Sequence, residues 1–499
     1  MSLVLFPHKQ VLHNQHLATH KMSVLITGAN GMLAKQLLYH TPDLRTWLQS
    51  HNGLLYASTR TKSTNGSCAV GAKSTSQNGY DIEEADDVLR IVHFFDDSNN
   101  ESSYFESPAF AHAVEHIIKP IAVIHAAAVS SPKECEQMSP AELRGYNTPT
   151  KMLDELFRFW SRGSCDESSS EVSGLERVPA GASLRRSVFI FCSTDMVYAG
   201  RDVAVASTAG LEDDASKKGQ KFCNSLCYSE SDPTEPVNAY GRSKLAFEQA
   251  AVAKTEEQPV KTVRIGPAPP GDEDNADDDP NRTSIKVYNL RLSNMLHTES
   301  RFLKTLLDAH ENKETLSLLT DSLRSFVALE DVAQAIFQIL AKNFDAKGAA
   351  PGEGQNKTTS SSSGILSAAA EEEKNIGSID MPSRELPEHE AVAKIYNIGG
   401  PAGLSRLDLA RIVEKVCAPV EQESPAPIDV EQPAQTSTSK ETWPLQPCLT
   451  RDLEAKMGYT VPLDLTMTSK KFEKEFGFRF RSIEDYLQQA LPRTAKNAT

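Results

Sequence analysis

Residues 24–38 constrain the fold of this chain most, because they join a short apolar run to a helical pattern through a glycine-containing turn. The run 24–26 predicts a buried strand, Gly28 and Gly31 mark the turn, and apolar residues recur at helical spacing from Met32. The free N–H groups and the dipole at a helix start favour a bound anion. The stretch therefore predicts an α/β fold with a dinucleotide pyrophosphate at the turn.

Composition excludes several other classes of protein. The 499 residues suffice for two or three domains, and a hydrophobic share of 39% predicts polar segments outside any core. A net charge of −15 argues against nucleic acid or an anionic membrane as the main partner. No apolar run reaches the roughly 18 residues that span a bilayer. We expect a cytoplasmic protein with no nucleic acid and no membrane partner.

The eight cysteines are scattered and include no Cys-x-x-Cys pair, which favours a reducing compartment and no metal site. Cys223 and Cys227 leave a disulfide or half of a metal site open as an alternative. No second pair of metal ligands follows them in the sequence.

Further strands are predicted at residues 53–60, 91–95, 121–125, 187–192 and 263–267, with helical patterns between most of them. Strands that alternate with helices predict a doubly wound parallel sheet. The ends of such strands meet at one edge of the sheet, where this architecture binds ligands. Residues at these ends are therefore the candidate site residues.

The strand exits predict how a dinucleotide binds. Ser58 and Arg60 stand at the exit of the second strand, where an acidic residue would favour NADH, so we expect NADPH. An exposed basic loop is the alternative. Ala126 and Ala127 follow the fourth strand, and their small side chains allow the backbone to lie against the cofactor. His125, just before them, is expected to be a structural histidine.

Two further motifs carry reactive groups. The first motif, Ser193-Thr194-Asp195, follows the strand 187–192. Its hydroxyl pair, Ser193 and Thr194, is expected to point into the crevice where this architecture binds ligands. Tyr240 and Lys244 are four residues apart, so a helix places them on one face. A tyrosine ordinarily titrates near pH 10, and a nearby lysine cation favours its phenolate.

Together with the glycine turn, these motifs resemble the extended short-chain dehydrogenase/reductase superfamily, whose fold is the doubly wound Rossmann sheet with a smaller α/β substrate domain. Within this superfamily, the residue sequence of the motifs resembles the dTDP-4-dehydrorhamnose reductase family, which also contains the regulatory beta subunit of methionine adenosyltransferase. The stretches that carry the resemblance are 193–198, 238–244, 324–333 and 396–401. Met196 departs from the pattern, since an aromatic residue often follows the Thr-Asp pair.

The resemblance implies roles for these residues. Tyr240 would donate a proton, Lys244 would also hold the nicotinamide ribose, and Thr194 would orient the substrate oxygen. Ser193 and Asp195 would contact the substrate. The implied cofactor-binding residues are Gly28, Asn30, Gly31, Met32, Ser58, Arg60, Asp96, Ala126, Ala127 and Lys244, with Asp96 near the adenine.

Two implied roles have ordinary alternatives. Arg324 would bind a substrate phosphate, because its guanidinium fork matches phosphate oxygens; alternatively it is a surface arginine paired with Glu330 or Asp331. Asn147 would support the lysine through water, or it would make an ordinary helix hydrogen bond.

The resemblance also predicts a domain organisation. A disordered leader would cover 1–21, and the cofactor-binding domain 22–265 would contain insertions near 61–80, 161–183 and 201–235. Substrate-binding segments would cover 266–345 and 393–491, separated by a disordered linker at 346–392 and interrupted by a polar insertion at 418–448.

Three functions are compatible with these motifs. The first is an NADPH-dependent reductase of a nucleotide-linked 4-keto-6-deoxysugar, and the second is an NADP-binding regulatory subunit of methionine adenosyltransferase without turnover. An epimerase or dehydratase with tightly held NAD is disfavoured by Arg60 and by the lack of an acidic residue on the other side of Thr194. Asp195 keeps this third alternative open. The implied partners are a nucleotide-sugar substrate and either a second copy of the chain or the methionine adenosyltransferase catalytic subunit.

Overall fold

The computed structural model describes residues 22–62, 80–96, 107–162, 186–201, 227–257, 284–345, 393–418 and 443–491. The predicted leader 1–21, the linker 346–392 and the strand expected at 263–267 lie outside these ranges. Most residues of the predicted insertions also lie outside the described ranges. Among the described residues, no helix is both long and apolar enough to span a membrane.

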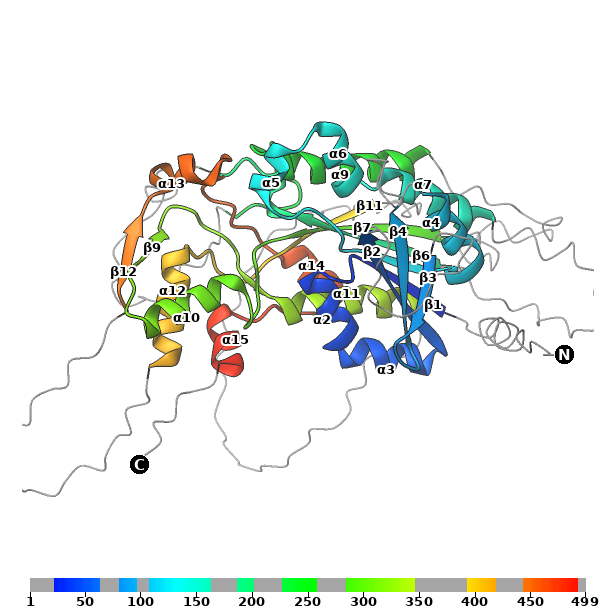
Figure 1. The fold of residues 1–499 in the computed structure, drawn as a ribbon, viewed down its shortest axis with the longest axis horizontal. Helices are drawn as coiled ribbons and strands as arrows, with labels where there is room; N and C mark the ends of the chain where they lie inside the picture. The colour runs from blue at the N-terminus through cyan, green and yellow to red at the C-terminus, as the bar shows by residue number, and fades with distance from the viewer. Residues whose placement is uncertain are drawn as a thin grey trace, which may run out of the picture.

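One large sheet organises the described residues, with strand order β11-β7-β6-β5-β1-β2-β4-β3 (Figure 1). Its neighbours pair in parallel, except that β3 pairs antiparallel with β4. The predicted doubly wound parallel sheet is confirmed. In chain order the strands are β1 (Met22–Thr27), β2 (Gly53–Lys62), β3 (Tyr80–Glu84), β4 (Leu89–Asp96), β5 (Ala122–His125), β6 (Arg186–Thr194), β7 (Ser284–Leu292) and β11 (Ala393–Ile398).

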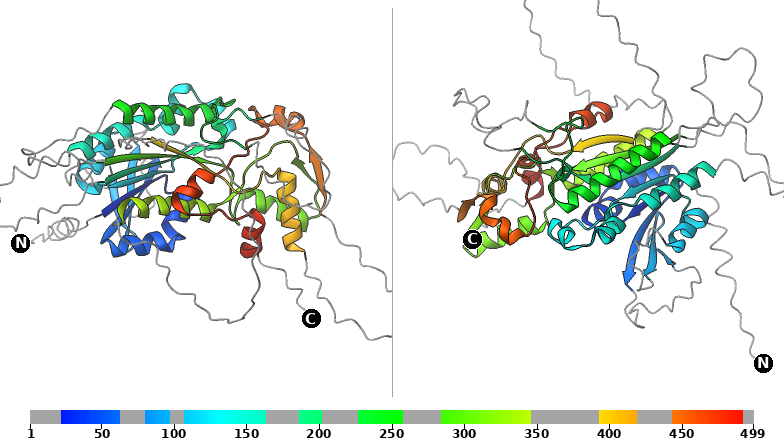
Figure 2. Two further views of the ribbon diagram at one scale, coloured as in Figure 1. Left: turned by 180° about the vertical axis from the view of Figure 1, so that it is seen from behind. Right: turned by 90° about the horizontal axis from the view of Figure 1, so that it is seen from above.

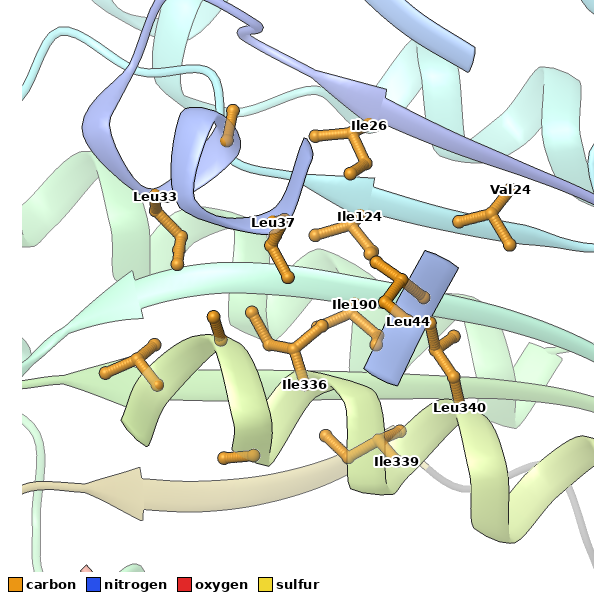
Figure 3. Close-up of a cluster of buried hydrophobic side chains, with 14 of the residues drawn as sticks. Val24, Ile26, Leu33, Leu37, Leu44, Ile124, Ile190, Ile336, Ile339 and Leu340 are labelled. Atoms are coloured by element: carbon orange, nitrogen blue, oxygen red, sulfur yellow. The ribbon is translucent and has the colours of Figure 1, made fainter. Parts of the chain in front are cut away.

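Helices cover both faces of this sheet, because alternate residues of each strand point to opposite sides. One face packs against α2 (Met32–Tyr39), α3 (Pro42–Ser50) and α11 (Leu329–Phe344). Figure 3 shows Val24, Ile26, Ile124 and Ile190 of the strands meeting Leu37, Ile336 and Leu340 of these helices. The other face packs against α4 (Pro108–His112), the π-helix Ala113–Ile118, α7 (Thr150–Arg162) and α9 (Ala239–Glu257).

A smaller part lies beyond the carboxyl ends of the strands, to the left of the sheet in Figure 1 and again at one end of the molecule in Figure 2. It has its own core, to which Leu303, Leu306, Ala410, Val413 and Leu487 contribute. Its elements are β8 (Met295–Leu296), α10 (Arg301–Glu311), β9 (Leu316–Leu319), β10 (Val327–Ala328), α12 (Arg406–Cys417), β12 (Leu445–Cys448), α13 (Thr450–Met457) and α15 (Ile483–Ala490). In contrast, α14 (Lys470–Phe476) packs against the large sheet, where Phe472 contacts Tyr396 of β11.

The structure differs from the organisation expected from the sequence in three respects. β7 and β11 belong to the large sheet, although the sequence assigned 284–292 and 393–398 to substrate-binding segments. β3 is an edge strand that the sequence did not predict. The insertions are also narrower than expected: Tyr228 stacks on Tyr198, and β12 pairs with β9.

Candidate active site

The turn after β1 packs tightly against the residues that follow β5. Gly28 has φ +78°, and a Cβ there would lie 2.7 Å from the Cα of Ala127, so only glycine fits. The Gly31 N–H donates to the Gly28 carbonyl at 2.8 Å, which tightens the turn at the start of α2. Asn30 and Met32 are exposed there, Met32 with 51% of its surface.

β1 lies between β2 and β5, so the chain leaves β1 in one direction and later returns on the other side. The crevice at such a reversal is where open α/β sheets bind ligands. Gly31, Ala126 and Ala128 line a cavity in this crevice, and their small size leaves room there for a dinucleotide. Ala127 packs against the hydrophobic core and against Gly28. The residues present therefore fit the cofactor that the sequence implies.

The far end of this crevice is formed by the exits of β2 and β4. These strands pair in register, with Arg60 opposite Phe94 and Lys62 opposite Asp96. Ser58 is completely buried, and its carbonyl accepts from the N–H of Ala29 at 3.1 Å. The side chains of Arg60 and Asp96 lie outside the described part, so their contacts with a cofactor stay predictions.

Tyr240 and Lys244 lie one turn apart on α9, as the sequence predicts. The helix is held tightly: a Cβ at Gly241 would lie 2.1 Å from the carbonyl oxygen of Met196. The Oδ1 of Asn238 accepts from the Gly241 N–H at 2.9 Å and fixes the first turn. This approach brings Tyr240 to hydrogen-bonding distance of the Thr194 hydroxyl.

Burial shifts the pKa values of both α9 residues. The pKa of Tyr240 is raised, chiefly by burial and next by the Asp195 carboxylate, while the hydrogen bond with Thr194 opposes the rise. Burial lowers the pKa of Lys244 to about 8. The Lys244 ammonium donates to the main-chain carbonyl of Cys192 at 2.9 Å and lies 4.6 Å from the ring centre of Phe191.

Asp195 is almost completely buried beside these groups. Its carboxylate accepts from the hydroxyls of Ser293 at 3.0 Å and Thr194 at 3.2 Å, and the Nε of Arg324 lies 3.9 Å away. Burial raises the pKa of Asp195, and the Arg324 charge opposes that rise.

Arg324 lines the same cavity and is buried, so its contact with a substrate phosphate stays a prediction. Its guanidinium donates to the carbonyls of Leu323 at 2.7 Å, Leu463 at 2.9 Å and Pro462 at 2.9 Å, and its side chain is only 4% exposed. The alternative of a surface arginine paired with Glu330 or Asp331 is therefore wrong. Asp331 instead pairs with Arg481 at 2.6 Å.

Ser193 and Asn147 also bond to protein groups. The Ser193 hydroxyl donates to the carboxylate of Glu248, which forms a buried ion pair of 2.7 Å with Arg291. The amide of Asn147 donates to the Ser243 hydroxyl at 3.1 Å and pairs with the main chain of Val129. Asn147 thus joins α6 (Pro140–Asn147) to the helix that carries Lys244.

His125 is buried at the end of β5, and its Nδ1 is 2.8 Å from the Thr27 hydroxyl. Burial holds its pKa well below the usual value, with a further contribution from the Lys244 charge. A neutral histidine in this position, stacked on Phe191, agrees with the structural role expected of it.

A cavity of about 410 Å³ connects these groups with the smaller part of the molecule. Gly31, Met32, Ala126, Thr194, Tyr240 and Lys244 line its cofactor side. The sequence did not identify the residues on its other side, because they come from separate segments with no common motif. Those residues include Ser293, Asn294, Met295, Arg406, Met457 and Tyr459.

The fold and the site thus define a dinucleotide-binding protein of the Rossmann type with a Tyr-x-x-x-Lys pair. Residues 24–350 match the NAD dependent epimerase/dehydratase family. The chain belongs to this family, and a nicotinamide dinucleotide is therefore its cofactor class. No curated protein matches the chain.

Several solved structures resemble the chain at low sequence identity. A dTDP-4-dehydrorhamnose reductase ortholog from Clostridium acetobutylicum is 12% identical, with TM-score 0.48 over 94% of this chain and 98% of that chain. A dTDP-glucose 4,6-dehydratase from Bacillus anthracis, in complex with NAD, is 14% identical, with TM-score 0.47 over 94% of this chain and 95% of that chain. A UDP-glucose-4-epimerase from Stenotrophomonas maltophila, with bound NAD and formylated UDP-arabinopyranose, is 13% identical, with TM-score 0.47 over 94% and 96%.

Proposed function

We propose that this protein is an NADPH-dependent reductase of a nucleotide-linked 4-keto-6-deoxysugar. The observation that carries the proposal is that Thr194, Tyr240 and Lys244 line one cavity together with the glycine turn at Gly31. Reduction of a ketone needs a proton donor within hydrogen-bond reach of the oxygen that gains charge. A hydroxyl pair beside the cofactor crevice supplies that geometry.

The roles follow from the local environments. A bound nicotinamide supplies the hydride. Tyr240 protonates the substrate oxygen, and its raised pKa keeps the phenol protonated throughout the neutral range. Thr194 orients that oxygen through its own hydroxyl. The Lys244 cation stabilises the phenolate that Tyr240 leaves behind, and it binds the ribose hydroxyls.

Two observations favour reduction over elimination of water. Dehydration needs a second acid or base beside the Thr194 hydroxyl, and the neighbouring cavity residue Met196 has no such group. Asp195 is the nearest carboxyl group, but it is buried and already accepts from Ser293 and Thr194. Preference for NADPH rests on the exit of β2, where Ser58 and Arg60 stand without an acidic residue.

The test is consumption of NADPH by the purified chain with dTDP-4-dehydrorhamnose, followed together with loss of the ketone. We expect one NADPH consumed per ketone reduced, and slower turnover with NADH. Conversion of the sugar without net NADPH consumption would instead indicate an epimerase. Tight NADPH binding without any conversion would contradict the reductase and favour the regulatory subunit, which copurification with the methionine adenosyltransferase catalytic subunit would then examine.

A further inference from the structure

Lys244 and Glu248 lie one turn apart on α9, and both are bound to the end of β6, the strand that carries Thr194. The Lys244 ammonium donates to the main-chain carbonyl of Cys192 at 2.9 Å, and the Glu248 carboxylate accepts from the hydroxyl of the next residue, Ser193. Residues four apart share one face of a helix. The helix therefore presents a positive and a negative group to the same end of one strand.

The Glu248 carboxylate is also bound by Arg291 of the neighbouring strand β7. Arg291 lies opposite Ser193 in the strand register, and its Nη2 and Nε donate to one carboxylate oxygen of Glu248 at 2.7 and 3.1 Å. Its Nη1 donates to the Tyr198 hydroxyl at 2.8 Å. The side chains of Lys244, Glu248 and Arg291 are all buried, so little water screens the two cations and the carboxylate from one another.

The other titratable groups around Lys244 in the described part of the chain are uncharged at neutral pH. Burial raises the pKa of the Cys192 thiol to about 12 and that of the Cys135 thiol to about 11. Burial also holds the pKa of His125 well below its usual value, so the imidazole is neutral. The phenol of Tyr240, on the same helix as Lys244, stays protonated because burial raises its pKa.

Two opposed charges therefore remain near Lys244. The Glu248 carboxylate opposes the lowering of the Lys244 pKa by burial. The Arg291 guanidinium neutralises that carboxylate through several charge-assisted hydrogen bonds, so the net effect of the pair on the lysine is small. Removal of either member leaves the other as an unbalanced charge.

We propose that Glu248 and Arg291 are positioning residues that hold Lys244 beneath the cavity and balance the electric field at its ammonium. The inference rests on the proposed function, because it takes the cofactor ribose and the Tyr240 phenolate as the groups that the Lys244 charge serves. Neither Glu248 nor Arg291 is among the described residues that line the cavity. Both act through the lysine.

The test is the pH dependence of NADPH affinity, and of kcat/KM with dTDP-4-dehydrorhamnose, in variants of the pair. Glu248→Gln keeps an acceptor for the Ser193 hydroxyl but leaves Arg291 unbalanced, so the alkaline fall of both profiles should move to lower pH by about 1 pH unit. Arg291→Met leaves Glu248 unbalanced and should move that fall to higher pH by about 1 pH unit. The double variant removes both charges and should return close to the unmodified chain.

Control variants separate charge from packing. Arg291→Lys keeps the charge and should leave the alkaline fall in place. Arg158→Met breaks an exposed pair of 2.7 Å with Glu155 on α7 and should also leave both profiles unchanged. If Arg291→Met does not fold, Glu248→Gln must still move the fall to lower pH and the double variant must still restore it.

The two readouts distinguish this inference from the proposed function. Reduction of the keto sugar with unmoved profiles in Glu248→Gln would overturn the inference alone. Movement of the alkaline fall in the same direction in both single variants would also overturn it, because a purely structural role does not depend on the sign of the charge removed. Opposite movements in the NADPH affinity profile, in a protein that reduces no keto sugar, would retain the inference and overturn the reductase.

Discussion

The ammonium of Lys244 donates a 2.9 Å hydrogen bond to the main-chain carbonyl of Cys192, at the end of the strand that carries Thr194. The lysine is thereby fixed beneath the cavity rather than left to sample solvent. Because it is buried without a carboxylate partner, its pKa falls to about 8. Its charge is consequently lost within a pH range that enzyme assays can reach.

We therefore predict that kcat/KM for keto-sugar reduction is flat below about pH 7 and falls above pH 8. The protonated lysine is the active form, so activity declines as pH rises through its pKa of about 8. Tyr240 should add no second fall below pH 10, because its pKa is raised. A pH–rate profile measures this, and a profile that stays flat to pH 9.5 would contradict it.

Burial of the same charge should destabilise the fold. The pKa of Lys244 is about 8 in the folded chain and about 10.5 when exposed, so the unfolded chain binds the extra proton between these values. The contribution of Lys244 to the free energy of unfolding is therefore lowest below pH 8, and it rises as the pH increases toward 10.5. Lys244→Met should raise the free energy of unfolding by about 1–3 kcal/mol at pH 7, while it abolishes turnover.

Denaturant titrations at pH 7 and pH 10 check this prediction. The advantage of Lys244→Met over the unmodified chain should be smaller at pH 10, where the lysine is neutral in the folded state. A lower stability of the variant at pH 7 would show that the hydrogen bond to Cys192 outweighs the cost of the buried charge.

Several features of this site were predicted from the sequence because they depend on local spacing. Gly28 and Gly31 must follow a strand, and Tyr240 and Lys244 must share a helix face, so short patterns identify them. β7 was not predicted at residues 284–292, because Lys286, Asn289 and Arg291 interrupt its apolar run. Only the tertiary structure shows that Arg291 is paired with Glu248.

The position of Arg406 at the cavity had no sequence signal of its own. Ser405 caps α12, and its hydroxyl accepts from the Asp408 N–H at 3.0 Å. Nothing in that pattern indicates that the next residue faces a cavity formed with segments far away in the chain. For Arg324 the sequence did give a signal, because its motif suggested phosphate binding. In the structure most of its N–H groups donate to main-chain carbonyl oxygens instead.

The buried pair Glu248–Arg291 gives a third prediction. The Arg291 side chain is 4% exposed and also donates to the Tyr198 hydroxyl at 2.8 Å. Arg291→Met leaves the Glu248 carboxylate buried without its partner, so it should cost about 3–5 kcal/mol of unfolding free energy. Arg158→Met breaks an exposed pair of the same 2.7 Å length with Glu155 and should cost below about 1 kcal/mol. Equal costs in chemical denaturation would contradict this account.

A fourth prediction concerns two buried asparagines on neighbouring strands. Both polar atoms of the Asn289 side chain lack a partner among the described residues, whereas Asn397 bonds to the Tyr198 hydroxyl at 2.9 Å and to the Tyr228 carbonyl at 3.1 Å. Asn289→Leu should therefore stabilise the fold by about 1 kcal/mol, and Asn397→Leu should destabilise it by about 1–3 kcal/mol. Thermal unfolding of the two variants distinguishes them, and a loss in both would refute the contrast.

The central claim is that the Tyr240 hydroxyl delivers the proton in a reduction. The most direct measurement is NADPH consumption with dTDP-4-dehydrorhamnose by Tyr240→Phe, compared with Tyr39→Phe, which removes an exposed hydroxyl outside the cavity. We predict that Tyr240→Phe binds NADPH normally and loses activity by about 100-fold or more, while Tyr39→Phe is unaffected. Unchanged turnover in Tyr240→Phe would contradict the proposed chemistry.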